Sequence, residues 1–230
     1  MHPRTKRLGL GTTAIVALLT LAAGPVAAGT GGVDGTFTQN GTSADIFSFD
    51  CGSNGDGTTT CTGFNLNIFS GKMTDNLTGV THANQLCVYV DSATYDDETG
   101  EPVGTPQTEV GCDVDLPNGA IKFGSKLSSA TLAPRLVSIQ QMDCSDKGNC
   151  IPGPTRDVTV AGSWVGIGPI TSGKYRSSSG DEFCREYDAG KASNRQATFG
   201  GSIDGIAAGT NGFASLSEGK FSFRSRCVEV

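Results

Sequence analysis

The acidic segment 91–101 contains the residues whose types and spacing point most directly to chemistry. Within it, Asp96, Asp97 and Glu98 are consecutive. Calcium takes several oxygen ligands from flexible loops, so these three residues form the candidate calcium site. The segment lacks the alternating acids and closing Glu of an EF-hand loop. The alternative interpretation is a solvated loop that keeps a hairpin edge soluble.

Cysteines provide the second chemical pattern. An even number of cysteines in an exported chain predicts disulfide bonds, and eight predict four of them. Zinc binding is disfavoured because no two cysteines have the two-residue spacing of a zinc knuckle and His82 is the only histidine beyond the predicted leader. The cysteines are Cys51, Cys61, Cys87, Cys112, Cys144, Cys150, Cys184 and Cys227.

Local spacing predicts how these cysteines pair. Polar stretches rich in turn-forming residues follow Cys51 and Cys144 and can reverse the chain, so each is expected to bridge a hairpin with the next cysteine. The segments around Cys87 and Cys112 can lie side by side within disulfide distance. The predicted pairs are Cys51–Cys61, Cys87–Cys112, Cys144–Cys150 and Cys184–Cys227. A crossed arrangement that links the two halves of the chain is the alternative.

Catalytic patterns are sparse. His82 lacks a sequence partner for nucleophilic catalysis, no Gly-x-Ser-x-Gly elbow occurs, and bridged cysteines supply no thiolate. Hydrolysis by two carboxylates stays open, because 23 acidic residues are present and the spacing it requires is spatial.

The strongest periodicity in the chain is two, and no window of 12 or more residues shows a helical stripe. The predicted fold class is therefore all-β, an antiparallel sandwich or barrel. Strands are predicted at 45–50, 63–70, 85–92, 108–114, 120–123, 136–142, 157–167, 182–187, 196–203 and 220–227.

Two of these strands show which residues face the core. Val158, Val160 and Trp164 share one face of segment 157–167. In segment 220–227, alternation predicts that Phe221, Phe223 and Cys227 face inward and that Arg224 and Arg226 face outward.

An internal repeat is predicted from the cysteines. Cys51, Cys61 and Cys87 correspond to Cys144, Cys150 and Cys184 at offsets of 93, 89 and 97 residues, whereas Cys112 and Cys227 do not align. The chain is accordingly divided into a signal peptide at 1–28, an acidic β lobe at 29–134 and a near-neutral β lobe at 135–230. The lobes are two related, disulfide-stapled units, and the sequence leaves open whether they share one sheet.

Residues 1–28 have the three parts of a secretory signal. Arg4, Lys6 and Arg7 form the basic start, residues 10–23 are apolar or small, and small residues precede the expected cleavage after Ala28. The apolar run is shorter than the roughly 20 residues of a bilayer span, so a retained anchor is the weaker alternative. We expect a secreted, extracellular protein with no membrane span in the mature chain.

Charge is unevenly distributed along the chain. The full sequence has 17 basic and 23 acidic residues, and removal of residues 1–28 takes away three basic residues and no acid. The net charge of the mature chain is then 14 − 23, or −9, which opposes nucleic acid binding. Residues 29–134 contain 3 basic and 13 acidic residues, and residues 135–230 contain 11 and 10. This asymmetry favours solubility, or else a cation site or an acidic face that meets a basic partner.

These observations favour a non-catalytic structural, adhesive or binding protein whose partner is an extracellular protein or polymer. No cofactor is expected apart from the candidate calcium ion. The alternatives are an extracellular hydrolase that uses paired carboxylates and a protease inhibitor that presents the loop between Cys144 and Cys150.

Overall fold

The computed structural model describes residues 35–75, 78–144, 150–180, 184–204, 206–207 and 212–227. The predicted signal peptide at 1–28 lies outside these residues. From Gly32 onward the chain forms one compact unit. Its described part is built from antiparallel strands and one short 3-10 turn, η2, Ser125–Leu127. The all-β, antiparallel prediction is confirmed.

Most strands are longer than the sequence patterns predict, although the one predicted at 120–123 is a residue shorter. The segments predicted as separate strands at 182–187 and 196–203 both fall on one continuous strand. In chain order the strands are β1 Gly35–Ser53, β2 Thr58–Asp75, β3 Thr81–His82, β4 Gln85–Asp96, β5 Pro102–Asp113, β6 Ile121–Phe123, β7 Ser129–Cys144, β8 Cys150–Gly166, β9 Thr171–Gly180, β10 Cys184–Ile203, β11 Ile206–Ala207 and β12 Gly212–Cys227. No part of the described chain forms a helix with the length and apolar character required to cross a bilayer.

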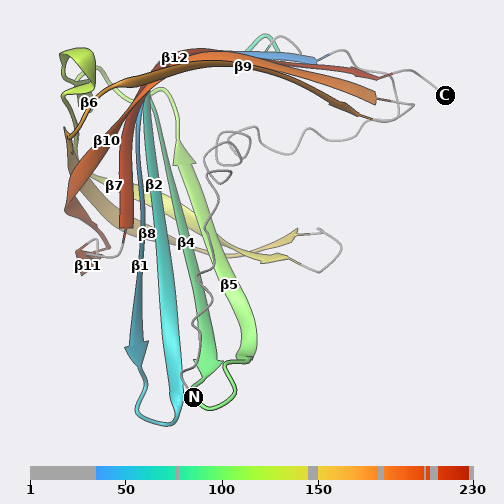
Figure 1. Ribbon diagram of the computed structural model, residues 1–230. Helices are drawn as coiled ribbons and strands as arrows, with labels where there is room; N and C mark the ends of the chain where they lie inside the picture. Colours follow the sequence, from blue (N-terminus) through green and yellow to red (C-terminus); the bar gives the residue numbers. More distant parts are fainter. Residues whose placement is uncertain are drawn as a thin grey trace, which may run out of the picture. The chain divides into compact units, whose positions relative to one another are not determined.

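The main strands close into a ring. Each pairs with the next in the order β1, β2, β4, β5, β7, β8, β10, β12, and β12 pairs back onto β1. Among the shorter strands, β3 pairs with β2, β6 with β7 and β11 with β10. The edge strand β9 also pairs with β10. Figure 1 shows β1, β2, β4 and β5 side by side. The two halves of the chain therefore share one sheet.

The predicted boundary between the lobes, at 134/135, lies inside strand β7. The pairing of β7 with β8 shifts between Leu132 and Arg135, so this position is a bulge in a continuous strand. The landmarks of the predicted repeat fall on β1, β2 and β4 in the first half and on β7, β8 and β10 in the second. The duplication itself stays a prediction.

The core lies on one face of the sheet. Val158, Val160 and Trp164 are fully buried, as their shared face predicts. The Trp164 ring packs edge-on against Phe199 with 4.8 Å between centroids, and its Nε1 donates a hydrogen bond to the backbone oxygen of Asp45 at 3.0 Å. This bond ties β8 to β1 across 119 residues of sequence.

Strand β12 differs from the prediction at its aromatic residues. Leu216 is fully buried in the core, and Phe221, five residues further along an uninterrupted strand, faces the opposite side. There the Phe221 ring lies 6.3 Å from the rings of Phe37 and Tyr175, and Phe223 shares that side. Arg224 is exposed. The side chains of Cys227 and Arg226 lie outside the described residues.

A row of small residues crosses five strands where their backbones approach closely. Gly71, Gly41 and Gly219 are directly opposed in β2, β1 and β12, and the row continues through Ala192 and Gly173. A Cβ atom at Gly41 would lie 2.3 Å from a neighbouring backbone oxygen, and one at Gly219 would lie 2.5 Å from another. Glycine in strand interiors marks close approach or tight bends, and Figure 1 shows β10 and β12 strongly curved.

Candidate functional site

A shallow hollow on strands β2, β4 and β5 is the candidate binding site. Its volume is about 310 Å³. It forms where β5 bulges: Ser92 of β4 pairs with Gln107, but Thr94 already pairs with Val103, so β5 carries extra residues there. Gly104, at φ +80°, allows this path because glycine tolerates a positive φ. A second hollow adjoins the first at Ser92 and Gln107.

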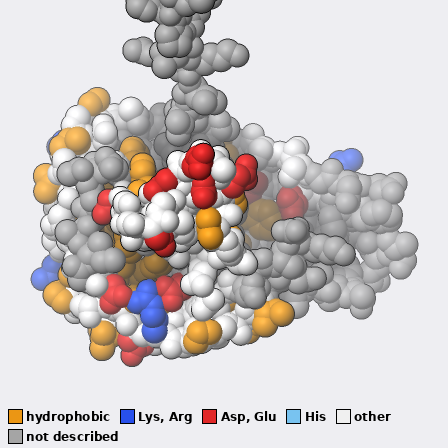
Figure 2. All heavy atoms as spheres, turned by 90° about the horizontal axis from the view of Figure 1, so that it is seen from below, with side chains coloured by type: hydrophobic (Ala, Val, Ile, Leu, Met, Phe, Trp, Pro, Cys, Tyr) orange, Lys and Arg blue, Asp and Glu red, His pale blue; other side chains and the backbone are white. Residues whose placement is uncertain are grey.

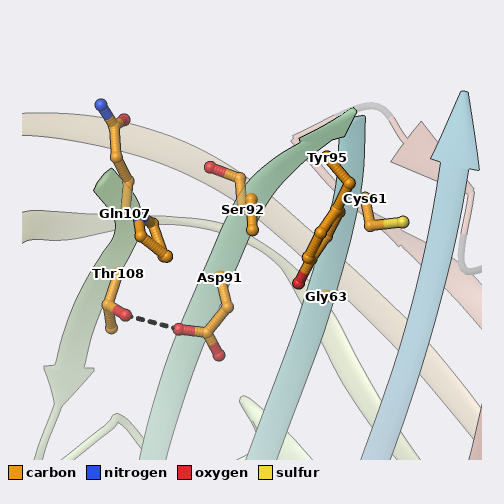
Figure 3. Close-up of a pocket in the computed structure, with 9 residues that line it drawn as sticks. Cys61, Gly63, Asp91, Ser92, Tyr95, Gln107 and Thr108 are labelled. Atoms are coloured by element: carbon orange, nitrogen blue, oxygen red, sulfur yellow. Dashed lines mark hydrogen bonds between the residues drawn. The ribbon is translucent and has the colours of Figure 1, made fainter. Parts of the chain in front are cut away.

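The lining of this hollow offers hydrogen bonds and one aromatic ring. The Thr108 hydroxyl donates to Asp91 Oδ1 at 2.7 Å, and the Tyr95 side chain stands beside Cys61 (Figure 3). Tyr95 is 38% exposed. Two-carboxylate hydrolysis requires a pair of acids, and Asp91 is the single carboxylate in the lining. The arrangement suits reversible binding of a small polar group. Sequence reasoning missed it, since it depends on a bulge that no residue pattern marks.

The predicted calcium residues lie at the β4–β5 turn, where the Asp96 carboxylate accepts hydrogen bonds from other residues of the turn. Its Oδ1 accepts hydrogen bonds from the Thr99 backbone N–H at 2.7 Å, the Thr99 hydroxyl at 3.0 Å and the Glu98 backbone N–H at 3.0 Å. The bonds from Thr99 and Glu98 lower the pKa of Asp96 below its ordinary value. Asp97 and Glu98 are exposed.

This turn lies beside the β1–β2 turn, because the Asp97 N–H donates to the Gly57 oxygen at 2.9 Å. Asp56 of that second turn accepts from Thr58, which lowers the pKa of the Asp56 carboxyl. Figure 2 views the molecule from the side of these turns and shows carboxylates gathered there. Within the described ranges, no three His, Cys, Asp or Glu side chains are grouped so that they could hold a metal ion. Calcium binding stays a prediction.

Two predicted disulfides are confirmed. Cys51 and Cys61 are directly opposed in β1 and β2, with Cα atoms 4.0 Å apart, and Cys87 and Cys112 are opposed in β4 and β5 at 4.1 Å. The crossed alternative is therefore wrong for these four cysteines. The register also places Cys144 opposite Cys150 and Cys184 opposite Cys227, whose side chains lie outside the described residues. Their pairing stays a prediction.

His82 has a structural partner. Its Nδ1 lies 2.9 Å from Asp115 Oδ2, and the Ala83 N–H donates to Asp115 Oδ1 at 2.9 Å. The bond from Ala83 and the neighbouring imidazole hold the pKa of Asp115 below its usual value. The pair fastens β3 to the segment that follows β5.

Asp45 is an acid that the sequence did not single out. Burial raises its pKa from 3.8 to about 6, against the opposing effect of hydrogen bonds from Asn67 and Ser43. Asn67 Nδ2 donates to Asp45 Oδ1 at 2.5 Å. An acid with a raised pKa is a property that hydrolases require, but Asp45 does not line either hollow.

Comparison with known protein-family models, curated proteins and solved structures found no match for this chain.

Proposed function

We propose that the protein is exported and acts in the extracellular environment by binding, without catalysis. The observation that carries this proposal is the pair of disulfides, Cys51–Cys61 and Cys87–Cys112, each between opposed residues of neighbouring strands. Disulfides persist in oxidising compartments and are rare in reducing ones. The basic and apolar pattern of residues 1–28 supports export independently of the disulfides.

Binding rather than hydrolysis is supported by the hollow beside the β5 bulge. It offers Asp91, Thr108 and Tyr95 to a polar ligand but holds a single carboxylate. The protease-inhibitor alternative rests on the loop between Cys144 and Cys150, and residues 145–149 lie outside the described residues.

Expression of the full chain in a secreting host tests the proposal. We expect the protein in the medium, beginning after Ala28, with all eight cysteines protected from alkylation until a reductant is added. The matched control is Leu18→Arg, which disrupts the apolar run and should retain the protein in the cell. An intact cytoplasmic product with eight alkylated cysteines would overturn the proposal.

A further inference from the structure

A line of lysines crosses five strands of the sheet. The register places Lys72 of β2 opposite Asn40 of β1, Asn40 opposite Lys220 of β12, Lys220 opposite Lys191 of β10, and Lys191 opposite Lys174 of β9. Directly opposed residues share a face of the sheet. We call these five residues the lysine row. All five are exposed, and at a strand spacing of about 4.8 Å the row extends about 19 Å.

No ion pair within the described part of the chain includes a lysine of this row. The ion pairs found there join His82, Arg135 and Arg156 to acids. Like charges directly opposite one another destabilise a sheet, so Lys174, Lys191 and Lys220 repel each other in the free protein. An anion that spans the row removes this repulsion.

The surroundings of the row add groups that suit sugars. Arg176, Ser222 and Thr38 lie two residues along their strands on the same face, so they add a further cation and two hydroxyls. Tyr187, also on this face, is 43% exposed and offers a ring. Glu218 is an acid on this face, two residues from Lys220.

We propose that the lysine row binds an acidic polysaccharide, a polymer of sugars that bear carboxylate or sulfate groups. This rests on the proposed export, which would place the protein among extracellular polymers. The charges are spread along a line and do not converge on a pocket, so they match a polymer with repeated charges better than a single small anion. Binding would release counterions from the polymer, so the affinity should fall as salt concentration rises.

The test measures binding of the mature protein to dextran sulfate and to polygalacturonate, with neutral dextran as the negative control. The variant is Lys174→Gln with Lys191→Gln. Its matched control is Lys122→Gln with Lys126→Gln, which removes the same charge from exposed lysines of β6 and η2. We expect the row variant to bind at least one polymer about tenfold more weakly and to reduce the salt slope by about 2, with little change in the control. Its unfolding temperature should be unchanged or higher, since repulsion is removed.

Three results would overturn the inference. The first is that the wild-type protein binds neither polymer. The second is that the two double variants weaken binding equally. The third is that the protein binds another partner more tightly than either polymer. Duplex DNA, phosphatidylglycerol vesicles and self-association in sedimentation are measured alongside for the third case. If the protein is exported and oxidised but fails here, only this inference falls. A reduced cytoplasmic product would instead overturn the proposed function.

Discussion

Arg156 donates two hydrogen bonds to the carboxylate of Glu109, from Nε at 2.8 Å and from Nη2 at 2.6 Å. Its Nη1 also donates to Asp204 at 2.5 Å. The guanidinium thereby joins β8 to β5 and to the end of β10, three segments that are far apart in the sequence. A planar guanidinium suits such bidentate contacts better than an ammonium group does.

Replacement of Arg156 should weaken the sheet where its two halves meet. Arg156 is 42% exposed, so solvent screens part of its attraction to the acids. We expect Arg156→Ala to lower the free energy of unfolding by about 1 kcal/mol, measured by urea titration. Lys122→Ala, at an exposed lysine, should change it much less. Equal losses in both variants would contradict this role for the Arg156 contacts.

Trp164 should be the most sensitive core position. Trp164→Phe removes both the hydrogen bond to Asp45 and part of a ring that is fully buried. We expect a loss of about 3 kcal/mol from the resulting cavity and the lost hydrogen bond, measured by circular dichroism during denaturation. Fluorescence is unsuitable, because Trp164 is the chain's single tryptophan. An unchanged midpoint would show that the neighbours repack freely.

The row of small residues that includes Gly41 gives a prediction with a control in the same strand. Gly41→Ala places a Cβ atom 2.3 Å from the Ser70 oxygen, so the backbones of β1 and β2 must separate. Gly52→Ala, in the same strand, meets nothing within 4 Å. We expect Gly41→Ala to cost at least about 2 kcal/mol and Gly52→Ala to be nearly neutral in thermal and urea unfolding. Comparable effects in both would show that close approach at Gly41 is unimportant.

Asp45 should make stability depend on pH. Its folded pKa of about 6 lies above its ordinary value of 3.8, so the folded state holds this proton more tightly than the unfolded state. The contribution to stability is complete below pH 3.8 and is lost as pH rises through about 6. Asp45→Asn, whose side-chain oxygen can still accept from Asn67, should match the wild type near pH 4 and exceed it by about 3 kcal/mol near pH 7. A difference that does not change with pH would contradict the raised pKa.

The two confirmed disulfides should differ in their effect on stability. Cys87 and Cys112 are separated by 25 residues, and Cys51 and Cys61 by 10. The longer loop loses more entropy when it is closed, so paired Cys→Ala replacement at 87 and 112 should lower the free energy of unfolding by about 0.8 kcal/mol more than replacement at 51 and 61.

Non-reducing peptide mapping of the wild type should also recover Cys144–Cys150 and Cys184–Cys227. Peptides that link the two halves of the chain would contradict this pairing.

The sequence was sufficient for features that depend on neighbours along the chain. Alternation identified the buried face that holds Val158, Val160 and Trp164, and hairpin spacing predicted the Cys51–Cys61 bridge. Strand β9 was not predicted, because its sequence has no apolar alternation; it reads Thr-Ser-Gly-Lys-Tyr-Arg-Ser-Ser-Ser-Gly. Its extended conformation depends on its pairing with β10.

Features that depend on register could not be predicted. The lysine row draws Lys72, Lys174, Lys191 and Lys220 from four strands, and a slip of one residue in any pairing would move a lysine to the other face. Phe221 and Phe223 have the alternation of core residues, but their face follows from their spacing to Leu216 along β12. The hollow at Asp91 requires the β5 bulge, which the residues alone do not mark.

Ring closure has a consequence for the order of events during synthesis. Strand β1 pairs with β12, from Gly35 opposite Ser225 to Ser48 opposite Gly212. One edge of the first described strand therefore has no hydrogen-bonding partner until the last described strand is present. A nascent chain that lacks the final segment cannot complete the ring. The sheet can therefore close only after β12 has been synthesised.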